Sequence, residues 1–160
     1  MPACLPQPAK VRCEQWGLDM HSLSPDDQRF QTSFEACAIA PAEFTHRAHL
    51  RLAYVYLAQY DVDAASQRMR DAINRFLAHR RIDASKYHET LTRAWLMAVR
   101  HFMDRAGSTA CAEDFLARSA ALLDANVMLT HYSKDVLFSP AARAGFVEPD
   151  LDPILHRTYS

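Results

Sequence analysis

The fold class is decided by residues 42–79, which read AEFTHRAHLRLAYVYLAQYDVDAASQRMRDAINRFLAH. This stretch has neither proline nor glycine, and it opens a longer segment, residues 42–139, that has no proline and a single glycine, Gly107. All-β folds need glycine and proline turns about every 8 to 12 residues. Apolar residues recur instead at the spacing of one helix face, as in the series Ala65, Met69, Ala72, Ile73 and Phe76. The sequence therefore predicts an all-α protein.

Length, composition and charge narrow the function classes. The chain has 160 residues, of which 49% are hydrophobic, so it can form one domain with a core. Its 18 Lys and Arg against 19 Asp and Glu leave a net charge of −1, which argues against a nucleic-acid partner. Three glycines cannot build the loops of the common nucleotide sites. Because neither a membrane-spanning run nor a secretion signal is found, no membrane partner and a cytoplasmic location are predicted.

One domain with two flanking segments is predicted. Residues 1–23 carry three prolines and no helical periodicity, so they are expected to form a flexible leader. Deleting residues 1–22 should then leave thermal stability nearly unchanged. Residues 24–150 are the expected helical bundle domain, and residues 151–160 a C-terminal tail. The bundle is predicted to have four main helices plus short C-terminal helices, the main ones at residues 25–37, 45–60, 64–79 (capped by Asp63) and 86–105.

Three of the eight histidines are predicted to face the core. On a projection of about 100° per residue, His46 and His49 fall on the apolar face of the second helix, one turn apart. His88 falls on the apolar face of the fourth helix, near its start. If the two helices are neighbours with their starts at the same end, the three rings converge. A buried ionisable ring needs a partner, so the sequence predicts either a shared metal or ligand, or separate structural hydrogen bonds.

A mononuclear metal centre is the first hypothesis for these rings. His46, His49 and His88 would bind a divalent transition metal, Fe, Zn or Mn, through neutral imidazole. Glu43 precedes His46 by three residues, a spacing that places two ligands on one metal in helical bundles. Because only one such motif is present, a two-metal carboxylate site is not expected. His131 is a further candidate ligand.

The predicted function is a small-molecule enzyme of the oxidoreductase or hydrolase class. Glu89 and Thr92 are the candidate catalytic residues, and Tyr56, Tyr87 and Arg143 the candidate substrate-binding residues. In the metal-dependent enzyme, Glu89 would orient the metal ligands or act as a general base. In a metal-free mechanism it would act as a general acid whose pKa is raised by burial. The alternative is a metal-free ligand-binding or interaction module whose buried histidines are satisfied by hydrogen bonds. A homodimer is compatible with either hypothesis.

Two histidine segments resemble a family of small bacterial all-helical proteins. They read FTHRAHL at residues 44–50 and YHETLT at residues 87–92. The resemblance covers residues 30–153 and implies a helical fold in which the two segments form a joint signature. It implies no reaction, since the family has no settled activity. Members of the family carry an aromatic residue in place of His131, which implies that His131 is not a common ligand.

Overall fold

The computed structural model describes residues 21–155 and confirms the all-α fold. Within this range the regular elements are helices, and one isolated bridge joins His21 to Thr109. No helix of this part is both long and apolar enough to cross a membrane. The α-helices are α1 (Pro25–Glu35), α2 (His46–Leu57), α3 (Val62–His79), α4 (Glu89–Ala106), α5 (Ala112–Arg118), α6 (Lys134–Leu137) and α7 (Pro140–Ala144). The 3-10 turns are η2 (Pro41–Glu43), η3 (Ala84–Lys86), η4 (Ala120–Leu123) and η5 (Ala125–Thr130).

Most helix starts follow from local capping residues. Ser24 caps α1 through a capping box with Asp27, and Thr45 caps α2 by accepting a hydrogen bond from the backbone N–H of Ala48. The predicted cap of α3 was wrong by two residues: Asp61, rather than Asp63, accepts the hydrogen bond from the backbone N–H of Ala64. Both aspartates suit the position chemically, so the sequence did not distinguish them.

Two helices end in a left-handed residue that is not glycine. Cys37 follows α1 with φ 57°, and Arg81 follows α3 with φ 56°. After α1, the N–H groups of Cys37 and Ala38 donate to the carbonyls of Phe34 and Ser33, which is the Schellman pattern. Arg80 then donates from its guanidinium to the carbonyls of Cys37 and Ile39. The end of α3 is thereby joined to the turn that follows α1.

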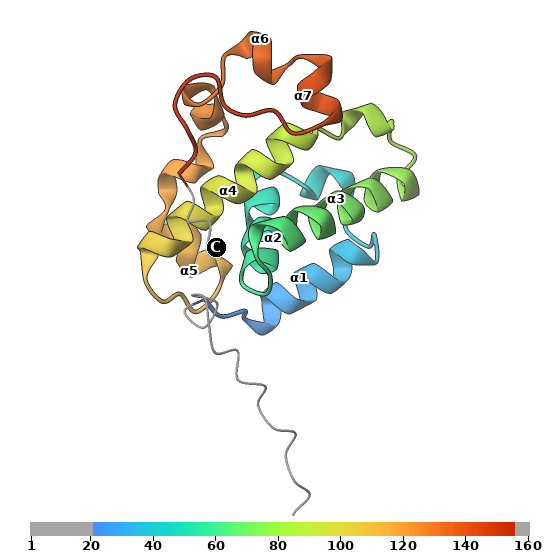
Figure 1. The fold of residues 1–160 in the computed structure, drawn as a ribbon. Helices are drawn as coiled ribbons and strands as arrows, with labels where there is room; N and C mark the ends of the chain where they lie inside the picture. The colour runs from blue at the N-terminus through green and yellow to red at the C-terminus, as the bar shows by residue number, and fades with distance from the viewer. Residues whose placement is uncertain (1–20, 156–160) are drawn as a thin grey trace, which may run out of the picture.

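The core surrounds α2, which contacts α1, α3, α4 and α5 (Figure 1). Its consecutive residues 52–57 are all buried, so α2 is apolar on every side in its second half. Helix α7, drawn in red, lies against the first half of α4, and α6, drawn in orange, packs beside α7 (Figure 1). The largest fully buried side chains are Tyr54, Tyr56, Tyr132, Phe34, Phe76, Phe115, Leu50, Leu52, Leu57, Met69, Leu96 and Met103.

The structure describes only residues 21–23 of the predicted flexible leader, residues 1–23, and two of these make contacts with the helical domain. His21 is 5% exposed. Its Nε2 donates to the carbonyl of Met103 at 2.9 Å, and its Nδ1 lies 2.6 Å from the hydroxyl of Thr109. Tyr54 donates to the carbonyl of Ser22 at 2.8 Å. Because a deletion of residues 1–22 would remove these contacts, we now expect it to lower thermal stability; residues 1–20 lie outside the described part.

The predicted boundary of the C-terminal tail at residue 151 also falls inside packed structure. The side chain of Ile154 is buried against the core. The N–H of Leu151 donates to the carbonyl of His131, and the His131 ring donates to the carbonyl of Asp152. Residues 151–155 therefore continue the domain, and residues 156–160 lie outside the described part.

Candidate functional site

His88 is a structural cap with both ring nitrogens engaged. It precedes α4, and its Nδ1 accepts a hydrogen bond from the backbone N–H of Leu91 at 3.2 Å. Its Nε2 therefore carries the proton, which it donates to the carbonyl of Leu137 at 2.8 Å. Burial, together with the nearby charge of Arg143, lowers the pKa of His88. A neutral ring with both nitrogens occupied has no lone pair for a metal.

His46 and His49 make separate hydrogen bonds of their own. The Nε2 of His46 donates to the carbonyl of Leu122 at 2.9 Å, and its ring packs edge-on against Trp95 with 4.6 Å between centroids. The Nδ1 of His49 donates to the carbonyl of Thr45 at 2.8 Å, and its ring stacks on Phe44 at 3.6 Å. The two rings therefore have different hydrogen-bond partners and different aromatic neighbours.

The three histidines do not converge, because the starts of α2 and α4 do not lie together. His46 contacts Trp95, which follows His88 by seven residues and so lies about 10 Å further along α4. The helices cross, and the start of α2 reaches the middle of α4. Among residues 21–155, no group of three or more His, Cys, Asp or Glu side chains is placed to hold a metal ion. The metal centre stays a prediction, and the arrangement of the rings does not support it.

The two further candidate metal ligands also have other roles. Glu43 accepts a hydrogen bond from the backbone N–H of Ala40 at 2.9 Å and thereby caps η2. His131 donates to the carbonyl of Asp152 at 2.8 Å in the C-terminal segment. Neither side chain is brought to His88.

Three of the other predicted residues line an open cleft of about 840 Å³ at the junction of α3, η3, α4 and α7. Tyr87, Glu89 and Arg143 line it, whereas Thr92 and Tyr56 do not. Thr92 donates to the carbonyl of His88, and Tyr56 donates to Glu35 on α1. The lining residues are Arg70, Ala84, Ser85, Tyr87, Glu89, Arg93, Arg143, Ala144, Gly145 and Phe146.

Glu89 is held in the cleft as an ionised carboxylate. Its Oε2 accepts hydrogen bonds from Tyr87 at 2.6 Å and from Nε of Arg70 at 3.0 Å, while its Oε1 accepts from Nη2 of Arg70. Burial alone would raise the pKa of Glu89, but the donors on Arg70 and Tyr87 outweigh burial, and the pKa is lowered. The expectation of a raised pKa was therefore wrong, and Glu89 is no general acid near neutral pH.

Arg143 lines the cleft and uses only one of its guanidinium nitrogens within the described part of the protein. Its Nη1 donates to the carbonyl of Ser85 at 2.7 Å, with the carbonyl of Tyr87 at 3.5 Å. Its Nε and Nη2 have no protein partner among the described residues. These two nitrogens form the planar edge that binds a carboxylate or phosphate through two parallel hydrogen bonds. Of the predicted substrate-binding residues, Arg143 is the one whose geometry matches that role.

Arg93 and Phe146 form a second wall of the cleft that the sequence did not reveal. The Arg93 guanidinium carbon lies 5.3 Å from the centre of the Phe146 ring. Buried Thr90 fixes this wall, since its hydroxyl donates to the carbonyl of Gly145 at 2.9 Å and accepts from the N–H of Val147 at 3.0 Å. No local spacing in the sequence connects Arg93 to Phe146 or to Arg70 on α3.

The lowered histidine pKa values predict that acid destabilises the fold. Burial is the main cause for His21, His49 and His88. The unfolded chain, with histidine pKa values near 6.5, binds more protons than the folded chain below that pH. The free energy of unfolding should therefore fall between pH 7 and pH 5, measured by urea denaturation at each pH.

Two variants test whether His88 contributes to this pH dependence of stability. The His88→Gln variant should show a shallower fall than the parent, whereas the exposed His79→Ala variant should keep the parent slope. An equal free energy of unfolding at pH 7 and pH 5 would contradict the prediction.

Comparison with known proteins adds no relative of this chain. No protein-family model, no curated protein and no solved structure matches it.

Proposed function

We propose that the protein is a metal-free binding module for a small organic anion, held in the cleft between α3, α4 and α7. This is the alternative that the sequence left open beside a metal-dependent enzyme. The observation that carries it is the unpaired guanidinium edge of Arg143, a residue that lines a cleft of a size suited to a small ligand.

The charges of the cleft favour an anion. Three guanidinium groups line it, Arg70, Arg93 and Arg143, against one carboxylate, Glu89. Glu89 neutralises Arg70 through a two-point ion pair, so two arginines remain. The rings of Tyr87 and Phe146 supply apolar surface for the carbon skeleton of the ligand. Such a combination of a few placed charges and aromatic walls is typical of small-molecule sites.

The hydrogen bonds of the histidines favour this function over the metal-dependent enzyme. His46, His49 and His88 each donate to a different backbone carbonyl. Buried His88 has both ring nitrogens satisfied within the fold, as expected for a group that holds a structure together.

The proposal is tested by replacing Arg143. Binding of butanoate, pentanoate and hexanoate and of the corresponding dicarboxylates is measured by calorimetry at one fixed ionic strength, since screening changes ionic affinities. At least one of these anions should bind saturably, and Arg143→Gln should weaken that binding about tenfold or more, because a charge-assisted hydrogen bond is lost.

A surface arginine provides the matched control. Arg29 on α1 is exposed, pairs with Asp26 and does not line the cleft. The Arg29→Gln variant removes the same charge and should leave the affinity unchanged. If no anion binds, or if both variants weaken binding equally, the cleft is not the anion site.

A further inference from the structure

We infer, on the basis of the proposed function, that the ligand of the cleft carries two separate anionic groups, one bound by Arg143 and the other by Arg93. A small dicarboxylate is the simplest compound of this class. The inference depends on how the cleft's three arginines are already paired within the protein.

Arg70 is the arginine least able to bind a ligand. Its Nε and Nη2 both donate to the carboxylate of Glu89, which also accepts from Tyr87. This carboxylate lies in the same cleft as Arg70, so the pair brings no net charge to the ligand. Displacing Glu89 would leave a buried carboxylate without its partner, which is costly.

Among the described residues, Arg93 has one hydrogen-bond partner, Asp63. Its Nη2 donates to Asp63 at 2.7 Å, but the Asp63 side chain is 79% exposed and does not line the cleft. An exposed ion pair of this kind is weak, because water screens both charges. The Nε and Nη1 of Arg93 have no hydrogen-bond partner among residues 21–155, and they belong to a side chain that lines the cleft.

Arg93 and Arg143 stand on different elements that share the cleft. Arg93 lies one turn into α4, and Arg143 lies on α7, which contacts α4. Phe146 follows Arg143 by three residues and packs on Arg93. Thr90 holds the segment of Phe146 on α4 through Gly145 and Val147. The two cationic groups therefore line one cleft from two different elements, with Phe146 held against Arg93, which suits one ligand with an anionic group at each end.

The experiment compares acids of equal carbon number. Butanedioate, pentanedioate and hexanedioate are each titrated against butanoate, pentanoate and hexanoate with the full-length protein at one ionic strength. The best dicarboxylate should bind about ten times or more tighter than its monocarboxylate, the gain from one further charge-assisted contact. The Arg93→Gln variant should abolish this ratio, while Arg143→Gln should weaken both members of the pair.

Asp63 provides a control for a purely structural effect. The Asp63→Asn variant breaks the same ion pair but keeps Arg93, so it should retain the preference for the dicarboxylate. Equal affinity for mono- and dicarboxylates, or a preference that survives Arg93→Gln, would overturn the inference and leave the anion site at Arg143 standing. If none of the six acids binds saturably, both this inference and the proposed anion-binding function are overturned.

Discussion

Replacing Asp27 by alanine is expected to lower the free energy of unfolding by about 3 to 5 kcal/mol, the cost of breaking a buried charge pair. Asp27 is 1% exposed. Its carboxylate accepts hydrogen bonds from the backbone N–H groups of Ser24 at 3.1 Å and Ala112 at 3.0 Å, and it pairs with Arg51 at 3.1 Å. Loss of this group leaves three donors from three parts of the chain without their acceptor. Urea denaturation followed by circular dichroism measures the change.

The neighbouring residue provides the matched control. The Asp26 side chain is 75% exposed and pairs only with Arg29 on the same helix. Because exposed pairs contribute little, Asp26→Ala should cost less than about 1 kcal/mol. Equal losses for the two variants would show that Asp27 acts only as an acidic residue in the first turn of α1.

Replacing His88 by alanine is expected to cost about 2 to 4 kcal/mol, from a lost helix cap and a lost buried hydrogen bond. The ring is the acceptor for the N–H of Leu91 and the donor to the carbonyl of Leu137, so it joins the start of α4 to the end of α6. The loss should be the same in chelator as without it, because these contacts need no metal. Denaturation and elemental analysis of the same samples give both quantities.

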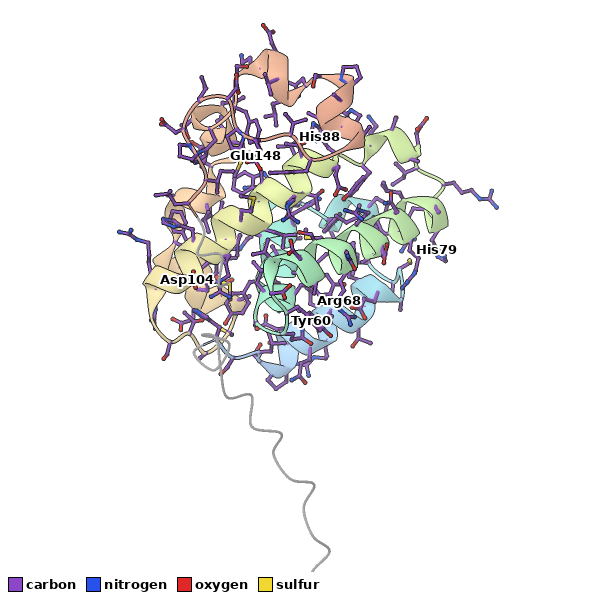
Figure 2. The ribbon with its side chains drawn as sticks, viewed as in Figure 1. Tyr60, Arg68, His79, His88, Asp104 and Glu148 are labelled. Carbon is purple, nitrogen blue, oxygen red and sulfur yellow. The ribbon has the colours of Figure 1, made fainter. Side chains whose placement is uncertain are left out.

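His79 is the control for His88. It is exposed at the end of α3, whereas His88 lies where α4 meets the C-terminal helices (Figure 2). His79→Ala should leave stability nearly unchanged. The metal centre would be favoured if His88→Ala lost bound metal and, after chelator had removed metal from both proteins, had the same stability as the parent.

The same contacts that stabilise the C-terminal helices also build the cleft. His88 directly precedes α4, and Thr90 lies in its first turn. Thr90 makes hydrogen bonds to Gly145 and Val147, and His88 makes one to Leu137. The YHETLT segment thus supplies two anchors for residues far along the chain and two cleft residues, Tyr87 and Glu89. A change at His88 is therefore expected to affect anion binding as well as stability.

Local sequence patterns determined the helices and most of their starts. The apolar spacing of α3 and the capping box of Ser24 and Asp27 depend only on residues within one or two turns, so they could be predicted without tertiary structure. The predicted burial of His88 is confirmed, although His88 caps α4 from outside the helix instead of lying on its apolar face. Arg143 was predicted as a substrate-binding residue and lines the cleft, and its binding of a ligand stays a prediction.

Only the tertiary structure decided which side chains meet. The crossing of α2 over α4 places His46 beside Trp95, so the histidines that share apolar faces do not share a site. The cleft brings Arg70, Glu89 and Arg143 together from three elements, and the pKa of Glu89 falls because Arg70 reaches it from α3. Helix periodicity specifies a face but neither the crossing angle nor the neighbour. Partners distant in sequence are therefore set by packing of the whole domain.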